Sequence, residues 1–189
     1  MSNYLIDSLS KGLLLTDINK EIILIGLISD THIPSRGLKV PELIINDFKK
    51  NKVDYIFHLG DHTTFKTHKY FVETFGKEKI ISVAGNMDDM SISRVLPKKR
   101  DIEILGYKIF LTHGEGGPQG IIERLNRKFD LRTFDIIVFG HTHKPFKEKR
   151  NGKYYFNPGA PTDRKFTNLN SYAYLKLTKD KIDFQIIYI

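Results

Sequence analysis

The run Leu24-Ile25-Gly26-Leu27-Ile28-Ser29-Asp30-Thr31-His32 decides the fold, because it joins an apolar segment to a carboxylate and an imidazole. An unbroken apolar run rich in Ile and Leu is typical of a strand buried on both faces, as in the parallel sheet of an α/β domain. Asp30 and His32 then lie at its carboxyl end. Side chains two residues apart in an extended segment point the same way, so these two donors can converge on one point. Such a point can hold a metal ion.

The segment after this run alternates helices and strands. Pro41 in a first helical turn and apolar residues at helical spacing predict a helix over 41–50, and Gly76 ends a second helix over 65–75. Between and after these helices the pattern predicts strands over 54–59 and 80–84. This alternation indicates a parallel sheet covered on both faces.

The second half of the chain is richer in strands. Gly106-Tyr107 predicts a hairpin, and Asn151-Gly152 predicts another turn. The expected elements are strands over 102–105, 108–112, 135–139, 146–150, 154–156, 172–177 and 182–189, and one helix over 120–129. We expect the strands of this half to form a second, largely antiparallel sheet packed on the first, with helices outside.

Length and composition favour one domain. The 189 residues suffice for a substantial core, and we assign residues 21–189 to a single domain. Residues 1–20 are read as an N-terminal extension whose leucines are spaced as in a short amphipathic helix, although a frayed terminus is an equal interpretation. The absence of cysteine excludes disulfides, zinc-thiolate sites and a thiol nucleophile, so a metal must be held by His, Asp, Glu or Asn.

Charge and hydropathy restrict the location and the partners. No apolar stretch is long enough for a membrane span and no export signal is recognised, so we expect a cytoplasmic protein without a membrane partner. The net charge of +8 favours anionic partners. The lysines and arginines are spread along the chain among acidic residues, which favours a solvated basic surface over a dedicated nucleic-acid interface.

Metal-type donors follow five of the expected strands. Functional groups of open α/β sheets gather at the carboxyl ends of strands, so we expect these donors to meet at one rim. A Gly-Asp pair after a strand is also typical of a turn, and Gly-Asn of a left-handed turn, but the ordered repetition favours a metal site. Seven donors are too many for one tetrahedral ion and suit two ions that share a ligand. The donors are Asp30, His32, Asp61, Asn86, His113, His141 and His143.

The ordered motifs Asp30-x-His32, Gly60-Asp61, Gly85-Asn86-x-Asp88, His113-Gly114 and Gly140-His141-x-His143 resemble the signature of the calcineurin-like metallophosphoesterases. The size of the chain and the segment Asn157-Pro158-Gly159 are similar to the small phosphodiesterase branch of archaea and bacteria, relatives of a eukaryotic retromer subunit. The resemblance implies an α/β fold of four layers, an αββα sandwich of two mixed sheets flanked by helices.

The resemblance also implies a ligand set and a metal. One ion would be held by Asp30, His32, Asp61 and His143, and the other by Asp61, Asn86, His113 and His141, with Asp61 bridging; Asp61, Asn86 and His113 would also serve catalysis. Two divalent ions are therefore expected as cofactors. The imidazole and oxygen donors suit Mn²⁺, Fe²⁺, Co²⁺, Ni²⁺ or Zn²⁺, and the resemblance favours Mn²⁺.

The expected chemistry is hydrolysis of a phosphodiester. Two cations about 3.5–4 Å apart lower the pKa of a bridging water, so that a metal-bridging hydroxide can attack phosphorus in line while an alcohol leaves. The expected substrates are small-molecule phosphodiesters or nucleotides. The leading interpretation is thus a metal-dependent phosphodiesterase.

One departure from the family pattern concerns the leaving group. Many phosphatases of the family have a His after the Asn of the third motif, where this chain has Met87, and a thioether has no proton to donate. The small phosphodiesterase branch also lacks that His. His62 adjoins the ligand Asp61, where it could approach the substrate or supply the missing proton, but a position at the surface or behind the ligands is the favoured interpretation. We expect Asp88 and Asn157 to orient ligand imidazoles as hydrogen-bond acceptors.

Two other functions remain open from the sequence. The first is a catalytically weak scaffold in a protein complex, as the retromer relative suggests, although retention of all seven donors favours an enzyme. The second is a nuclease that exploits the positive charge, which would require steep salt dependence of nucleic-acid binding. The sequence is also compatible with a homodimer formed through the terminal strands or the N-terminal extension.

Overall fold

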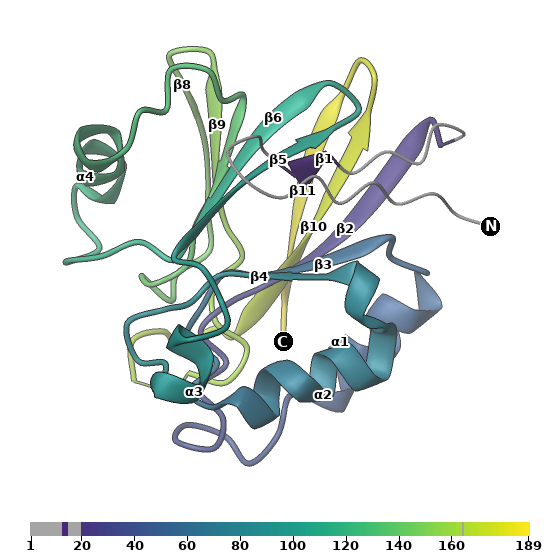
Figure 1. Ribbon diagram of the computed structural model, residues 1–189, viewed down its shortest axis with the longest axis vertical. Coiled ribbons are helices and arrows are strands. Elements are labelled where there is room, and N and C mark those ends of the chain that lie inside the picture. Colours follow the sequence, from purple (N-terminus) through teal and green to yellow (C-terminus); the bar gives the residue numbers. More distant parts are fainter. Residues whose placement is uncertain (1–12, 15–19, 164) are drawn as a thin grey trace.

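The computed structural model describes residues 13–14, 20–163 and 165–189, and these form two stacked sheets with helices on the outside (Figure 1). Helices α1 (Glu42–Lys50) and α2 (Phe65–Phe75) lie along one outer side, and α4 (Ile121–Lys128) lies on the opposite side. The expected four-layer αββα sandwich is therefore confirmed.

The strands belong to two mixed sheets. The five-stranded sheet has the order β11-β10-β2-β3-β4, and the six-stranded sheet has the order β1-β5-β6-β7-β9-β8. The strand bounds are β1 Leu13–Leu14, β2 Ile22–Ile28, β3 Tyr55–His58, β4 Ile80–Ser82, β5 Lys99–Ile104, β6 Tyr107–Thr112, β7 Ile136–Val138, β8 Phe146–Arg150, β9 Lys153–Asn157, β10 Ser171–Thr178 and β11 Ile182–Tyr188.

A second sheet packs on the first as expected, but the expectation that it is largely antiparallel and contains all strands of the second half is wrong in two respects. The C-terminal hairpin β10–β11 joins the first sheet, where β10 pairs antiparallel with the edge of β2 that β3 leaves free. The six-stranded sheet is mixed, because β6, β7 and β9 run parallel to one another. A hairpin pattern predicts antiparallel partners, but it carries no information about which sheet edge the hairpin extends.

Three apolar clusters lie between the four layers. The largest fills the space between the sheets, with Ile25 and Leu175 from one sheet and Ile109 and Val138 from the other, all of them buried. A second cluster packs α1 and α2 on the five-stranded sheet, and a third packs α4 on the six-stranded sheet. Strands β2 and β3 are buried on both faces, which accounts for their unbroken apolar sequences.

Close packing at Gly26 fixes α1 over the centre of the first sheet. A Cβ atom at this position would lie 2.8 Å from the ring of Phe48, so only glycine allows the helix to approach the strand this closely. Phe48 is fully buried and also contacts the rings of Tyr172 and Tyr174 edge-on. The glycine within the apolar run is therefore a packing requirement of this helix.

The boundaries of most expected elements agree with the structure to within one or two residues. Helix α2 has the expected bounds, whereas β5 begins three residues earlier than expected. The 3₁₀ helix η1 (Lys77–Lys79) and the short helix α3 (Met90–Ser93) were not expected; Asp89 caps α3 by accepting from the backbone N–H groups of Ser91 and Ile92.

The predicted N-terminal helix lies outside the described residues, apart from Leu13 and Leu14, which form β1 and pair parallel with β5. No helix in the described part of the chain is long and apolar enough to cross a membrane.

Parallel pairing gives the sandwich a rim where the carboxyl ends of six strands meet. Strands β2, β3 and β4 run parallel in one sheet, and β6, β7 and β9 run parallel in the other. Every sequence motif with a metal-type donor follows one of these strands. The topology therefore brings the donors to one edge of the molecule, as the strand-end rule predicts.

Candidate metal centre

The seven predicted donor residues meet at this rim, and both sheets contribute. Asp30, His32, Asp61 and Asn86 follow strands of the five-stranded sheet, whereas His113, His141 and His143 follow strands of the six-stranded sheet. Hydrogen bonds between the loops fix their relative positions: the Asp30 N–H donates to the carbonyl of Gly60, and the His141 N–H donates to Oδ2 of Asp30. The donor loops are thus tied to one another directly.

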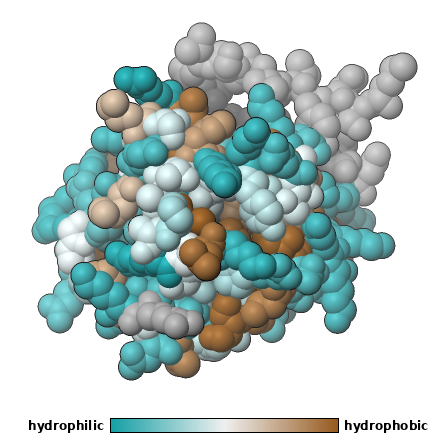
Figure 2. All heavy atoms as spheres, turned by 90° about the horizontal axis from the view of Figure 1, so that it is seen from below, coloured by the Kyte–Doolittle hydropathy of each residue, from teal (hydrophilic) through white to brown (hydrophobic). Residues whose placement is uncertain are grey.

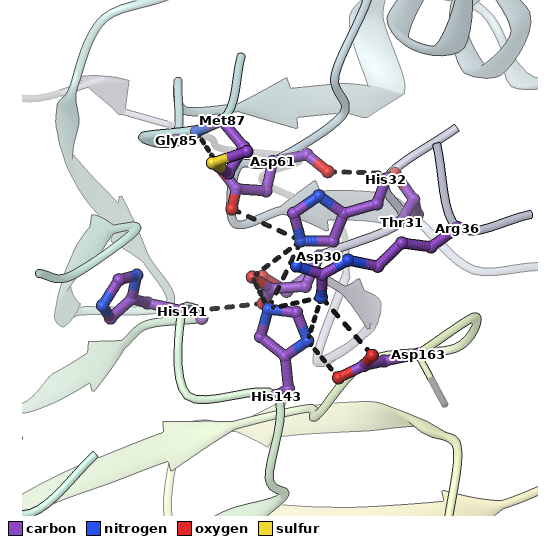
Figure 3. A network of polar contacts seen from close by, with 12 residues as sticks. Asp30, Thr31, His32, Arg36, Asp61, Gly85, Met87, His141, His143 and Asp163 are labelled. Carbon is purple, nitrogen blue, oxygen red and sulfur yellow. Dashed lines mark hydrogen bonds and ion pairs between the residues drawn. The ribbon is translucent and has the colours of Figure 1, made fainter. Parts of the chain in front are cut away.

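The first group of donors is buried and compact. One ligand atom from each of Asp30, His32, Asp61 and His143 lies within 4.8 Å of the others, a spacing that can hold a metal ion. The Nε2 atoms of His32 and His143 are 3.3 Å apart, and Nε2 of His143 is 3.2 Å from Oδ1 of Asp30. Figure 3 shows these side chains pointing toward one another, Asp30 and His32 from the loop after β2, Asp61 from the loop after β3 and His143 from the loop after β7.

The second group lies beside the first and shares Asp61 with it. Oδ1 of Asn86 is 3.0 Å from Nε2 of His113 and 2.8 Å from Nδ1 of His141. Oδ2 of Asp61 is 3.3 Å from Nε2 of His113 and 3.4 Å from Nε2 of His32. The carboxylate of Asp61 therefore stands between the two groups.

The outward nitrogens of three imidazoles have hydrogen-bond acceptors. Nδ1 of His113 donates to the carbonyl of Leu59 at 2.7 Å, Nε2 of His141 donates to the carbonyl of Gly116 at 2.5 Å, and Nδ1 of His143 donates to Oδ2 of Asp163 at 2.5 Å. A neutral imidazole carries one N–H, so these acceptors leave the lone pair on the nitrogen that faces the centre. This tautomer is the one that binds metal.

The carboxylate oxygens at the centre have room for a cation as a partner. Oδ2 of Asp30 accepts from the hydroxyl of Ser29 and from the His141 N–H, and Oδ1 of Asp61 accepts from the Met87 N–H. Oδ1 of Asp30 is buried and has no hydrogen-bond partner within the described structure. A buried carboxylate oxygen without a partner is costly, and a metal ion among these nitrogens and oxygens would satisfy it.

Residues 23–180 match the family model described as the calcineurin-like phosphoesterase superfamily domain. The chain belongs to the calcineurin-like phosphoesterase superfamily. The family is divalent-metal dependent, which agrees with the clustered donors. The resemblance read from the ordered motifs is therefore confirmed.

Two archaeal proteins are similar to this calcineurin-like chain in sequence, and a sorting protein is similar to it in fold. A probable metallophosphoesterase of Methanothermobacter thermautotrophicus is 34% identical over 87% of this chain and 91% of its own length. A phosphodiesterase of Methanocaldococcus jannaschii is 27% identical over 71% of this chain and 82% of its own. Vacuolar protein sorting 29 of Cryptosporidium parvum has a similar fold, with a TM-score of 0.71, 22% identity and coverage of 90% of this chain and 99% of its own.

The backbone of this calcineurin-like centre is not extended, which corrects one step of the sequence argument. Asp30 has a φ of 54°, His32 44°, Asp61 56°, His141 68° and His143 60°, all in the left-handed region. The side chains separated by two residues do converge, but they do so through tight left-handed turns after the strands. Non-glycine residues in this region are uncommon and gather at functional sites, where surrounding contacts hold them.

Two glycines allow the donor loops to approach each other. A Cβ at Gly85 would lie 2.1 Å from Oδ1 of Asp61, and a Cβ at Gly140 would lie 1.9 Å from the hydroxyl oxygen of Ser29 and 2.8 Å from Oδ2 of Asp30. Nonbonded atoms do not approach a real Cβ atom this closely. The glycines before Asn86 and His141 are therefore required by the close passage of neighbouring loops.

Asp88 and Asn157 brace loops and do not accept from the ligand imidazoles, contrary to expectation. Asp88 accepts from the N–H groups of Gly85 and Thr63 and contacts Nδ1 of His62 at 3.3 Å. The amide nitrogen of Asn157 donates to the carbonyl of Gly140 and to the hydroxyl of Thr142. Both side chains thus connect the loops that carry the donors.

His62 is fully buried behind the centre. Its ring stacks on that of His58 with centroids 3.6 Å apart, and its exposed fraction is 0%. It is absent from the residues that line the open cavity over the donors, whereas Met87 lines this cavity with 55% of its surface exposed. His62 is therefore not placed to approach a substrate in this cavity.

Three residues of the site were missed from the sequence. Asp163 accepts from His143, and Arg36 lies beside both of them. Arg124 donates to the carbonyls of Glu115, Gln119 and Gly117, which holds the loop whose Gly116 carbonyl accepts from His141. Asp163 follows β9, which is parallel to β7, so the strand-end rule applied to this strand would have indicated it.

Burial and charge act against each other on the pKa values of the donor side chains. Burial raises the pKa of Asp30, but the imidazoles of His113 and His143 outweigh it and bring the pKa to about 2. Burial lowers the pKa of His113, but the carboxylates of Asp30 and Asp61 outweigh it and hold the pKa at about 9. Burial lowers the pKa of His32 and that of His141 below the ordinary value. His113 is thus the imidazole that holds its proton most firmly.

The close approach at Gly85 leads to the first prediction. Gly85→Ala forces Asp61 to move, and we expect the affinity for Mn²⁺ to fall by about 10- to 100-fold, the range found when supports of metal ligands are lost. Gly117→Ala is the matched control, because a Cβ there meets nothing within 4 Å. Isothermal titration of both variants, with circular dichroism as the check on folding, measures the difference. Equal affinities would contradict the role given to Gly85.

The raised pKa of His113 leads to the second prediction. Because the folded state holds the proton of His113 up to a pH of about 9, this proton stabilises the fold in the absence of metal. The stabilisation is fully present below the ordinary pKa near 6.5 and is lost as the pH rises through 9. Metal binding needs the neutral ring, so at about pH 7.5 we expect binding to release about one proton and to tighten as the pH rises toward 9. Calorimetry in buffers of different ionisation enthalpy measures this release.

His68→Gln is the control for proton release. Burial lowers the pKa of His68 to about 4, so this ring is neutral at pH values near 7 and releases no proton when metal binds. The variant should show the same release as the wild type. Release that stays constant up to pH values well above 9 would contradict the assignment to His113.

Proposed function

We propose that the protein is a phosphodiesterase that uses two divalent metal ions, Mn²⁺ being the preferred one, to hydrolyse small-molecule or nucleotide phosphodiesters. The proposed ligands of one ion are Asp30, His32, Asp61 and His143, and those of the other are Asp61, Asn86, His113 and His141. Membership of the calcineurin-like superfamily and the similarity to an archaeal phosphodiesterase support hydrolase activity.

The observation that carries the proposal is the position of Asp61. Its Oδ2 atom lies 3.4 Å from an imidazole of one donor group and 3.3 Å from an imidazole of the other. Its Oδ1 atom accepts from the Met87 N–H at 2.7 Å, which fixes the rotation of the carboxylate. A carboxylate held between two donor groups in this way suits a shared ligand of two ions.

The remaining residues position the donors and shape the cavity. Two bound divalent ions supply Lewis acidity that activates water near neutral pH and binds phosphoryl oxygens. The carbonyls of Leu59 and Gly116 and the carboxylate of Asp163 keep the imidazole rings in the orientation that ligation needs. The cavity over the donors, about 350 Å³, has the exposed residues Met87 and Lys144 in its lining and admits a small ester.

Metal-dependent hydrolysis is the third prediction. Chelator-treated protein should be inactive toward bis(p-nitrophenyl) phosphate and regain activity with Mn²⁺, with Fe²⁺, Co²⁺, Ni²⁺ and Zn²⁺ tested in parallel. Asp61→Asn should lower kcat/KM by at least about 100-fold, since it removes a group on which charge stabilisation in the transition state depends. Asp183→Asn, an exposed carboxylate paired with Lys181, is the matched control and should leave the rate unchanged.

The thioether side chain of Met87 in the cavity lining leads to the fourth prediction. The thioether of Met87 cannot protonate a leaving alkoxide, so aryl phosphodiesters should be hydrolysed faster than alkyl phosphomonoesters. Met87→His should raise the rate for an alkyl monoester by about 10-fold or more, because general acid catalysis contributes on the order of 10²- to 10⁴-fold.

Met90→His is the control for that variant, since Met90 is 69% exposed and does not line the cavity. Steady-state rates with bis(p-nitrophenyl) phosphate and with glycerol phosphate, measured at the same Mn²⁺ concentration, make the comparison. Wild-type turnover of the alkyl monoester at the rate of the aryl diester would contradict the prediction.

A scaffold without turnover is the second candidate, and one surface feature favours it. Several large apolar side chains are exposed, among them Leu38 at 94% and Tyr70 at 39%, and both border a groove of about 380 Å³. Figure 2 shows apolar side chains among hydrophilic ones on the face at the lower end of Figure 1. The similar fold of vacuolar protein sorting 29 agrees with such a role. Folded protein that binds two metal ions but hydrolyses no ester would support the scaffold over the enzyme.

A further inference from the structure

Arg36 is a cation at the edge of the metal centre that the proposed hydrolysis does not yet use. It lies in the loop between β2 and α1, where its backbone N–H donates to the carbonyl of His32 at 2.7 Å. Its side chain is 23% exposed and lines the same cavity as Asp61 and His143. Figure 3 shows the side chain of Arg36 reaching from its loop toward His143 and Asp163.

Two contacts hold the guanidinium in this position. Nη1 of Arg36 forms an ion pair with Oδ1 of Asp163 at 3.4 Å, and the guanidinium carbon lies 5.0 Å from the ring centroid of Phe166. Nη1 is also 3.1 Å from Nδ1 of His143, but that nitrogen donates its own proton to Asp163. Nδ1 of His143 is therefore not an acceptor for Arg36, and Nε2 of the same ring, at 3.5 Å from Nη1, is at the limit of a hydrogen bond.

Asp163 does not use up the hydrogen-bonding capacity of Arg36. The carboxylate already accepts from the N–H groups of Lys165 and Phe166 and from Nδ1 of His143. The ion pair at 3.4 Å is longer than the roughly 2.7–2.9 Å of a charged hydrogen bond. Within the described residues, Nε and Nη2 of Arg36 have no hydrogen-bond partner. The guanidinium therefore keeps free donors at the cavity.

The charges around the cavity favour an anionic occupant. Its lining includes two cations, Arg36 and Lys144, and one carboxylate, Asp61, which is a proposed metal ligand. Divalent ions on the donors would repel the guanidinium unless negative charge lay between them. The nonbridging oxygens of a phosphoryl group supply that charge, and the planar fork of arginine matches their geometry.

We propose that Arg36 binds a nonbridging oxygen of the substrate's phosphoryl group, with Asp163 and the ring of Phe166 fixing the guanidinium for this contact. The inference rests on the proposed function, because that function places a phosphoryl group in this cavity. Arg36 is then a specificity-determining residue for phosphoryl anions, and it acts beside the metal ligands without being one of them.

Inorganic phosphate is the probe that tests the contact without requiring turnover. Isothermal titration of phosphate into Mn²⁺-loaded protein should show about 10- to 100-fold weaker binding for Arg36→Ala, the fold-change expected when one charged hydrogen bond is lost. The variant's metal content, measured by elemental analysis, should equal that of the wild type. Arg36→Lys should fall between the two, since it keeps the charge without the planar fork.

Arg127→Ala is the matched control. Arg127 is an exposed arginine on α4 outside the cavity, so its loss changes the net charge equally but leaves the site intact. Its phosphate affinity and its kcat/KM for bis(p-nitrophenyl) phosphate should equal those of the wild type, whereas Arg36→Ala should lower kcat/KM in parallel with its phosphate affinity.

The outcomes separate this inference from the proposed function. Unchanged phosphate affinity in Arg36→Ala overturns the inference, even in an active enzyme. Loss of a metal ion from both Arg36→Ala and Arg36→Lys would assign Arg36 to bracing His143 and also overturns it. If phosphate binding depends on Arg36 but the protein hydrolyses no ester, the result supports the inference and contradicts the proposed phosphodiesterase activity.

Discussion

The convergence of lone pairs in a buried space is the constraint on which the rest of this structure depends. Imidazole nitrogens of His32 and His143 face each other at 3.3 Å, and Oδ1 of Asp30 lies among them without a hydrogen-bond partner in the described structure. Such an arrangement is unfavourable without a compensating cation. The rings cannot turn away, because acceptors behind His113, His141 and His143 hold their outward nitrogens. The surroundings therefore preorganise the centre for positive charge.

The rim could be predicted from the sequence because it depends on topology alone. Parallel strands end at the same edge, so donors placed after apolar strands must come together whatever the details of their loops. The order of the motifs then identified the family. The terminal hairpin could not be placed in the same way, because its alternating pattern fits any free antiparallel edge, and β10 in fact pairs with β2.

The supporting contacts could not be predicted because they depend on the paths of loops in space. Asp163 lies 20 residues from His143, and the carbonyl of Gly116 lies 25 residues from His141. No local pattern links such pairs. The left-handed backbone at Asp30 and His32 was also missed, since an apolar strand gives no sign of the turn that follows it. Each such residue costs on the order of 1–3 kcal/mol, which the packed loops around the rim must offset.

Both sheets supply donors to one centre, and this couples ion binding to the integrity of the sandwich. Asp30 and Asp61 belong to loops of one sheet, and His113 and His143 belong to loops of the other, so an ion bound among them acts as a clamp across the layer boundary. An ion that binds only the native chain stabilises it by an amount that grows with the logarithm of its free concentration. The supply of metal in the surroundings would then set the stability of the fold as well as its chemistry.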